Sequence, residues 1–429
     1  MLNKIKNTIL KLDRFLFKKF GSDKGVQFLQ SIKEVRTLFS YLNDSDKENQ
    51  VRFVGGCVRK SFHGEIIDDI DLATSLTPEE IKKKLKGKNI TIIDTGIEHG
   101  TLTMVLNKKK FEITTLRKDV STDGRHASVK FTLNWEEDAA RRDFTINAIY
   151  VDIYGRIFDP MNGIKDLESG DIKFIGEASE RIQEDFLRIL RYFRFFLQYS
   201  KSDHNISIIK SIKKNINGIN KISNERIFDE LKKILVLKNF YSLFYNTSSK
   251  EIILNIFPQF KYYERLNKLN DFSVEFKKKY DKYLVLALLI IDQSKSYEYF
   301  CHKYKTSNSI KKRFENISKN FNDIKDKNFF SYTNIKKIIY LTSKDQVLDL
   351  LLFSVLINKK IDIEDIKKLI QYINVYKVPK FPISGEYLKT HGYKSGPNLG
   401  KKLKLLEEQW LKNNFVLDKK LLDKSLKIN

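Results

Sequence analysis

The chain has 429 residues, 41% of them hydrophobic, and this length exceeds what one ordinary hydrophobic core supports. Its formal net charge of +25 and pI near 9.6 favour a polyanionic partner. Two cysteines, Cys57 and Cys301, are too few and too far apart for a zinc cluster or a disulfide framework, so we expect a reducing, cytoplasmic location. The apolar runs at 283–291 and 348–357 cover about half a membrane span and predict buried helices, not membrane segments.

Arginine is concentrated in one region of this lysine-rich chain. Only 16 of the 79 basic residues are arginine, and eleven of these lie between Arg52 and Arg194. A guanidinium group is a planar fork that matches phosphates and base edges, and lysine cannot reproduce that geometry. The clustering therefore indicates that forked donors are needed in this region.

The first part of the chain is predicted to be mixed α/β. Residues 1–30 are basic and amphipathic at their start and lack a cleavage site, so we expect a surface helix and not a signal peptide. Residues 31–160 form the predicted head. Its short β-type runs are 51–54, 70–73, 90–94, 101–106 and 111–116. Helical stretches lie between them at 57–62 and 78–86.

The rest of the chain is predicted to be helical. Glycine and proline almost vanish between Glu177 and Pro379, and helical periodicity replaces the short β-type runs. We expect a helical neck at 161–235 and a helical body at 236–378. Glycines and prolines between 381 and 400 then interrupt the pattern and mark a tail at 379–429.

A paired glycine follows the first predicted strand. A strand that runs into Gly55-Gly56 and then a helix leaves backbone N–H groups at the helix N-terminus, where an anion can approach closely. Arg59, one turn further on, can reach the same phosphates. A tight strand–helix turn without a ligand is the alternative for this motif.

Two aspartates lie on the second predicted strand. Side chains alternate faces along a strand, so Asp69 and Asp71 project together while Ile70 and Leu72 enter the core. Adjacent carboxylates repel each other unless a cation lies between them, and Mg²⁺ held by one or two carboxylates plus substrate phosphates is usual in phosphoryl transfer. The alternative is a charged turn.

Glu112 interrupts an otherwise apolar and threonine-rich strand. A carboxylate in mid-strand seldom stays unpaired. It could complete the metal site as a third carboxylate, or it could form an ion pair with a neighbour such as Arg117.

Two further clusters combine acidic and basic residues. In residues 136–147, Arg141, Arg142 and Asp143 could contact triphosphate and sugar, or they could belong to a salt-bridged helix start. In residues 180–195, we expect one helix with an apolar stripe and an opposite side that presents four side chains three residues apart. These are Asp185, Arg188, Arg191 and Arg194. They could read a base edge, or they could form a solvated basic face.

Together these motifs resemble the class II tRNA nucleotidyltransferase and bacterial poly(A) polymerase family. The matching segments span about residues 50–235: the Gly-Gly-x-Val-Arg turn, Asp-Ile-Asp-Leu-Ala-Thr (69–74), Arg-Arg-Asp-Phe-Thr-Ile-Asn-Ala (141–148), Asp-Pro-x-Asn-Gly (159–163), the Glu-Asp-x-x-Arg-x-x-Arg helix and Ser-Asn-Glu-Arg (223–226). The resemblance implies an α+β fold, with a polymerase-β-like nucleotidyltransferase head followed by an all-helical neck, body and tail.

The resemblance also assigns roles. Asp69 and Asp71 are expected to bind catalytic Mg²⁺, with Glu112 as a further catalytic carboxylate. Asp185 and Arg188 are expected to act as a protein template for C and A. The residues expected to bind the nucleotide are Gly55, Gly56, Arg59, Arg141, Arg142, Asp143, Asn147, Asp185, Arg188, Arg191 and Arg194. The family's flexible loop corresponds to residues 117–138, including 123–126, and is full length here.

The expected reaction is addition of CCA to tRNA 3′ ends from CTP and ATP, without a nucleic-acid template. The body and tail are expected to bind the tRNA by shape and phosphate charge. A poly(A) polymerase, or an inactive RNA-binding protein on the same scaffold, remains an alternative. No membrane association and no obligate protein partner are expected.

Overall fold

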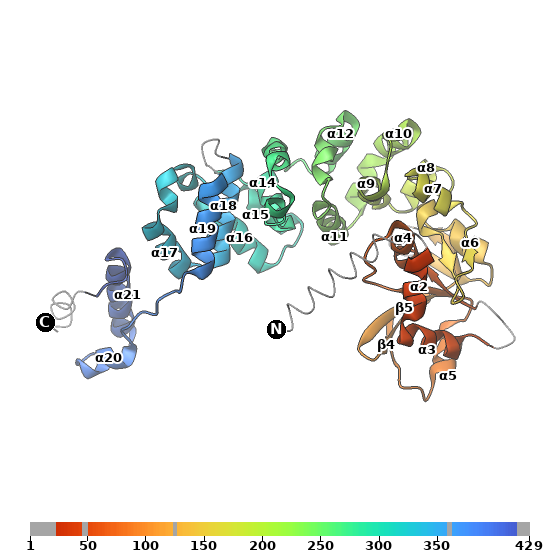
Figure 1. Ribbon diagram of the computed structural model, residues 1–429, viewed down its shortest axis with the longest axis horizontal. Helices are drawn as coiled ribbons and strands as arrows, with labels where there is room; N and C mark the ends of the chain where they lie inside the picture. Colours follow the sequence, from red (N-terminus) through yellow and green to blue (C-terminus); the bar gives the residue numbers. More distant parts are fainter. Residues whose placement is uncertain (1–22, 45–49, 123–126, 358–362, 418–429) are drawn as a thin grey trace. The chain divides into compact units, whose positions relative to one another are not determined.

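The computed structural model describes residues 23–44, 50–122, 127–357 and 363–417 (Figure 1). It divides into two compact units, Met1–Ile256 and Phe257–Asn429. Residues 1–22 of the expected N-terminal helix lie outside the described residues. Within the described part, no helix is both long enough and apolar enough to cross a membrane. The predicted bounds of the N-terminal helix, head, neck, body and tail stay predictions.

The first unit contains a mixed seven-stranded sheet with the order β3-β4-β5-β2-β1-β8-β9. Only the pairing of β2 with β5 is parallel, and the other described pairs in this sheet are antiparallel. The strands are β1 (Val51–Val54), β2 (Asp71–Thr74), β3 (Thr91–Gly96), β4 (Thr101–Leu106), β5 (Lys109–Thr115), β8 (Tyr150–Val151) and β9 (Ile157–Phe158). The five predicted strands are confirmed within two residues, while the two-residue β8 and β9 carried no pattern long enough to be predicted.

One face of the sheet carries most of the head's core. Alternate strand residues such as Phe53, Leu72 and Ile113 are fully or almost fully buried on this face, as period-two alternation requires. Four helices cover them: α2 (Asp23–Ser31), α3 (Lys33–Leu42), α4 (Gly56–His63) and α5 (Pro78–Leu85). The start of α5 is specified locally, because Thr77 and Glu80 form a reciprocal capping box in front of a proline at the first turn.

The opposite face is covered over only part of its width. A smaller cluster there includes Val54, Ala73 and Tyr150, with Trp135 from α6 (Trp135–Ala140) against it. The expected flexible loop is largely regular, because β6 (Arg117–Thr122) and β7 (Ala127–Phe131) pair as an antiparallel hairpin. Residues 123–126, which connect the two strands, lie outside the described residues.

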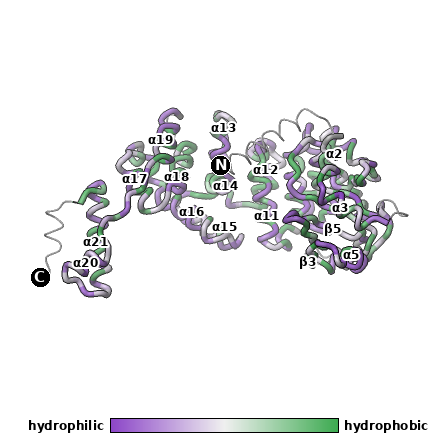
Figure 2. Tube along the Cα trace, turned by 60° about the horizontal axis from the view of Figure 1, so that its bottom comes forward, coloured by the Kyte–Doolittle hydropathy of each residue, from purple (hydrophilic) through white to green (hydrophobic). Residues whose placement is uncertain are grey.

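The helices that follow the head complete the first unit. They are α7 (Gly163–Ser169), α8 (Ala178–Glu184), α9 (Arg188–Tyr199), α10 (Ile206–Asn215), α11 (Asn224–Leu235) and α12 (Thr247–Ile256). Helix α9 packs on α11 and contributes buried Ile189, Phe193 and Phe195. In Figure 2 hydrophobic and hydrophilic positions alternate along most helices, as amphipathic packing requires.

A buried ion pair joins α9 to α11. The guanidinium of Arg194 donates to the carboxylate of Glu230, which is 2% exposed. Burial lowers the pKa of Arg194, and Glu230 opposes that effect by stabilising the charged form. Because each charge has lost its water, each depends on the other.

The second unit is helical throughout its described elements. These are α13 (Val274–Lys277), α14 (Lys282–Ile290), α15 (Ser296–Lys303), α16 (Asn308–Lys319), α17 (Tyr332–Leu341), α18 (Lys344–Ile357), α19 (Ile363–Val375), α20 (Gly385–Thr390) and α21 (Pro397–Lys412), with short 3₁₀ turns between them. The two long apolar runs form α14 and α18, which are almost entirely buried, so the prediction of buried helices is confirmed. Helices α20 and α21 share a separate small core around Leu388 and Leu406.

We expect Glu230→Ala to lower the free energy of unfolding of the first unit by about 3 kcal/mol, because it leaves the Arg194 guanidinium buried and unpaired. Urea unfolding would be followed by the fluorescence of Trp135 in a Trp410→Phe background, since the chain has two tryptophans. The matched control is Glu251→Ala, which breaks an exposed pair with Lys213 and should cost less than about 1 kcal/mol. Equal effects of the two variants would contradict a structural role for the buried pair.

Candidate active site

The paired glycines form the turn between β1 and α4. Gly55 has φ +70° and ψ −125°, a conformation that residues with a side chain rarely adopt. A Cβ atom at Gly55 would lie 3.9 Å from Asp71 Oδ2 and 3.8 Å from Arg142 Nη1, and one at Gly56 would lie 3.8 Å from Asp71 Oδ2. The open N-terminus of α4 thus adjoins one of the predicted metal ligands and one of the predicted phosphate ligands.

The three predicted carboxylates gather where β2 meets β5. Strand β2 begins at Asp71, one residue later than predicted. Asp71 is therefore its first residue, and Asp69 lies two residues before the strand. Glu112 is in register with Asp71 on the parallel neighbour β5. Asp71 is half-buried, whereas Asp69 and Glu112 are exposed. The preceding Asp68 accepts a hydrogen bond from Lys60.

The electrostatics of this group are unfavourable in the absence of a cation. Burial raises the pKa of Asp71 to about 6, and the neighbouring carboxylates Glu112 and Asp69 contribute to the rise. Arg142 and Lys60 oppose it only in part. A divalent cation beside Asp71 would relieve this repulsion, and carboxylate oxygens are the donors that such hard cations prefer.

The carboxylates do not form a closed cage. Among the described residues, no three His, Cys, Asp or Glu side chains converge into a complete metal site. Phosphoryl-transfer sites usually hold their ions with one or two carboxylates plus substrate phosphates, so an incomplete protein ligand set fits this chemistry. Within the described part, Glu112 forms no ion pair, and Arg117, its proposed alternative partner, donates to the carbonyl of His99.

A carboxylate that the sequence analysis did not select holds the arginines of this site. Asp138 of α6 is 1% exposed and accepts hydrogen bonds from Arg141 Nε at 2.8 Å, Arg142 Nη2 at 3.0 Å and the Tyr150 hydroxyl at 2.7 Å. Burial alone would raise the pKa of Asp138, but Arg142 and Arg141 hold it well below its usual range. The spacings of three and four residues between Asp138 and the arginines, on a predicted helix, could have revealed it.

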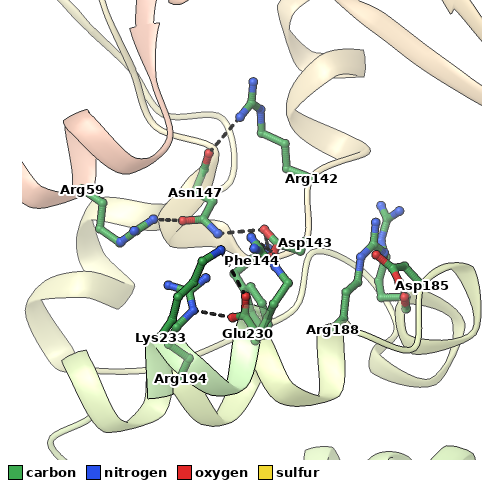
Figure 3. Close-up of polar contacts among 12 residues, drawn as sticks. Arg59, Arg142, Asp143, Phe144, Asn147, Asp185, Arg188, Arg194, Glu230 and Lys233 are labelled. Atoms are coloured by element: carbon green, nitrogen blue, oxygen red, sulfur yellow. Dashed lines mark hydrogen bonds and ion pairs between the residues drawn. The ribbon is translucent and has the colours of Figure 1, made fainter. Parts of the chain in front are cut away.

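Four more predicted residues form a chain of polar contacts, and Figure 3 labels three of them, Arg59, Asn147 and Asp143. Arg59 of α4 donates to Asn147 Oδ1, and Asn147 Nδ2 donates to Asp143 at 2.8 Å. Arg191 of α9 donates to the same Asp143 carboxylate at 2.6–2.7 Å. Arg59 is 6% exposed and lies over the ring of Phe195, 4.6 Å from its centroid. The turn after β1 is thereby tied to the neck helix α9.

The charge on Asp143 is maintained by these contacts. Burial would raise the pKa of this carboxyl, but Arg191 and the Asn147 amide lower it to about 2. Asp143 is therefore ionised at neutral pH.

The prediction of a single helix across residues 180–195 is wrong, because the helix is interrupted at Asp185. Helix α8 ends at Glu184, Asp185 is extended, and α9 begins at Arg188, so Asp185 does not lie on the helix of the three arginines. The Asp185 carboxylate accepts the Leu187 amide at 3.1 Å, and this local bond competes with a continuous helix.

Asp185 and Arg188 have separate partners in this structure. Arg226 of α11 donates to Asp185 at 2.7 Å. Arg188 donates to Glu184 at 2.5 Å and to the carbonyl of Arg181 at 2.9 Å. Asp185 is therefore held by a donor and Arg188 by acceptors, although Figure 3 draws the two side chains beside each other.

Comparisons with known proteins agree with this architecture. A family model described as "Poly A polymerase head domain" matches residues 51–173. "Probable RNA and SrmB- binding site of polymerase A" matches 206–264, and "tRNA nucleotidyltransferase domain 2 putative" matches 274–425. The fold resembles that of the Bacillus stearothermophilus CCA-adding enzyme in complex with CTP, with a TM-score of 0.66 and 24% identity over 89% of this chain and 93% of that one. The Thermotoga maritima CCA-adding enzyme complexed with tRNA gives a TM-score of 0.62 and 20% identity over 95% of this chain and 98% of that one.

The head defines a polymerase-β-like nucleotidyltransferase, and the remainder of the chain is largely helical, as predicted. The mouse protein "CCA tRNA nucleotidyltransferase 1, mitochondrial" is 33% identical over 95% of this chain and 93% of its own length. The chain therefore belongs to the family of CCA tRNA nucleotidyltransferases, or CCA-adding enzymes, whose members use divalent metal ions.

The raised pKa of Asp71 predicts a pH dependence of stability. The unfolded carboxyl loses its proton near pH 4 and the folded one near pH 6, so the free energy of unfolding should fall by on the order of 2 kcal/mol as pH rises between these values. Asp71→Asn should remove this component when urea unfolding is compared at pH 4 and pH 7 in EDTA. The control Asp68→Asn should not, because the pKa of Asp68 is lowered. Equal pH slopes for the wild type and Asp71→Asn would refute the carboxylate repulsion.

Proposed function

We propose that this protein adds C, C and A to the 3′ end of tRNA, using CTP and ATP as substrates. The observation that carries the proposal is the meeting of the Gly55-Gly56 turn, Asp71 and Arg142 at one edge of β2, in a chain related to CCA tRNA nucleotidyltransferases over 95% of its length. Similar solved structures include CCA-adding enzymes in complex with tRNA, ATP and CTP, which are the substrates proposed here.

The incoming triphosphate would lie on the N-terminus of α4. Backbone N–H groups at Gly55-Gly56 would face its phosphates, and Arg142 would supply a guanidinium that Asp138 already orients. Arg141, on the other side of Asp138, and Arg59 would add positive charge nearby. Asp143 and Asn147 offer an acceptor and an amide to the ribose.

Asp69 and Asp71 would hold Mg²⁺, with Glu112 beside them as the third carboxylate. When bound, Mg²⁺ supplies positive charge that favours the deprotonated 3′-hydroxyl and stabilises the pyrophosphate leaving group. No side chain has to form a covalent intermediate. The protein residues bind the triphosphate, orient it and set the charge of the site.

The RNA end would approach over β5 and β4. In-line displacement places the attacking and leaving oxygens on opposite sides of the phosphorus, and the glycine turn lies on the β1 side of Asp71. On the other side, Thr103 is in register with Glu112. Hydroxyl pairs Thr101–Thr114 at 3.0 Å and Thr95–Thr103 at 2.9 Å follow the same part of the sheet. They offer hydrogen bonds to a terminal ribose.

Base selection would require an exchange of partners. Asp185 supplies acceptors and Arg188 supplies donors, which can match C and A after small adjustments. To meet a base edge, Asp185 would leave Arg226 and Arg188 would leave Glu184. Arg191 and Arg194 are held by Asp143 and Glu230 and would support the nucleotide from α9.

The remaining parts of the proposal concern the partner and the location. The body at 236–378 and the tail at 379–429 would bind the tRNA, and the neck at 161–235 would select the nucleotide. Poly(A) synthesis is the runner-up activity. A cytoplasmic location is proposed from cysteine use alone, while the mouse and human relatives are named mitochondrial.

We expect Asp69→Asn and Asp71→Asn to abolish nucleotide incorporation and Glu112→Gln to lower turnover about 10²-fold, equivalent to about 3 kcal/mol of transition-state stabilisation. The measurements are single-turnover rates with tRNA trimmed of its CCA end, together with the tRNA Kd, which should change only a few-fold. Asp68→Asn is the neighbouring control and should keep wild-type turnover. A near wild-type rate in either aspartate variant would refute the two-carboxylate metal site.

We expect wild-type enzyme given all four NTPs to add C, C and A and then stop. Asp185→Ala should relax this choice about ten- to hundredfold, because each unmatched base otherwise leaves a buried polar group unpaired. Sequencing of the products measures both results, and Asp229→Ala on α11 is the exposed control. Long A tracts from the wild type would establish the poly(A) activity instead. Unchanged selectivity in Asp185→Ala would exclude the template role.

A further inference from the structure

A surface groove of about 300 Å³ lies in the second unit, beside the start of α17 and the first turns of α19. Its lining is mainly apolar and aromatic and includes Phe330, Tyr332, Ile366 and Leu369. Asn328 and Lys368 provide polar atoms at the same groove. All of these residues belong to the second unit, whereas the catalytic carboxylates belong to the first.

Three tyrosines form a continuous aromatic ridge, and one of them, Tyr332, lines this groove. Tyr332 is 53% exposed, and its ring centroid lies 4.5 Å from that of Tyr372 at an interplanar angle of 68°. Tyr376, one turn further along the chain, stacks on Tyr372 with centroids 5.8 Å apart. A single exposed tyrosine needs no explanation, but an aromatic ridge beside an apolar groove favours a planar ligand.

The charge around the ridge selects among planar ligands. Lys336 follows Tyr332 by one helical turn, Lys368 precedes Tyr372 by one turn, and exposed Lys377 follows Tyr376 directly. Asp365 is the acidic residue in the groove lining and lies 4.0 Å from Lys368. An aromatic surface with surrounding lysines fits a base whose backbone phosphates lie beside the ring.

We propose that this groove binds one unpaired nucleobase of the tRNA, stacked on Tyr332. This inference rests on the proposed function, because tRNA is the polynucleotide that the active site would extend. Paired bases present only their edges, so the occupant would be a base from a loop and not from the acceptor stem. The groove would thus distinguish a complete tRNA from a short hairpin with the same 3′ end.

The test compares two substrates with the same 3′ end. One is a complete tRNA lacking CCA, and the other is a hairpin that reproduces only its acceptor stem. Tyr332→Ala should raise the Kd for the complete tRNA about tenfold, because one base stack is lost. It should leave the hairpin's Kd and rate of CMP addition unchanged. Tyr332→Phe keeps the ring and should bind the complete tRNA as the wild type does.

Tyr299→Ala is the matched control, since Tyr299 on α15 is 61% exposed and is also a tyrosine of the second unit. It should not change either Kd, and circular dichroism should show the same helix content in all variants. Wild-type affinity of Tyr332→Ala for the complete tRNA would overturn the proposal, as would equal losses with both substrates. Failure of the wild type to extend the complete tRNA would instead refute the proposed function, so the two failures are distinguishable.

Discussion

Buried carboxylates fix the guanidinium groups on which the head and neck of this protein depend. Asp138 holds Arg141 and Arg142 at the end of α6, Asp143 holds Arg191 of α9, and Glu230 holds Arg194 between α9 and α11. Each of these carboxylates is largely removed from water and accepts hydrogen bonds from an arginine, so loss of the arginine alone would leave a buried charge unpaired at a large cost. This constraint explains why arginine persists here in a chain that otherwise uses lysine.

The predicted metal site follows the opposite rule. Asp71, Asp69 and Glu112 are brought together by the β2–β5 pairing without enough positive charge to neutralise them, and the pKa of Asp71 rises to about 6 as a result. A compensated ion pair gains little from a further ion, whereas an uncompensated carboxylate group gains electrostatic stabilisation from one. The same edge of the sheet thus combines arginines that Asp138 holds in place with carboxylates that favour a cation.

The contact between Asp143 and Arg191 also links the head to α9, the helix proposed to support the nucleotide. Arg59, Asn147, Asp143 and Arg191 form one line of hydrogen bonds from α4 to α9. A change in the position of the Gly55-Gly56 turn would therefore be transmitted to α9 through these hydrogen bonds. Asp185 and Arg188 lie outside this line and have partners of their own, Arg226 and Glu184, which the proposed selection of bases would have to displace.

The sequence alone indicated a mixed α/β part followed by helices, the five longer strands of the seven-stranded sheet, and the positions of the glycine turn and the aspartate pair. Alternation of side chains and the special backbone freedom of glycine act over a few residues, so a local pattern records them. The sequence also identified the buried helices α14 and α18 from composition. Tertiary structure decided which groups meet. Only the β2–β5 register placed Glu112 opposite Asp71, and only packing buried Asp138 against Arg142 and Tyr150. The break at Asp185 depended on a side-chain bond to the Leu187 amide, which helical periodicity does not contain. Contacts between residues distant in sequence depend on the packing of whole elements, and no local pattern records that packing.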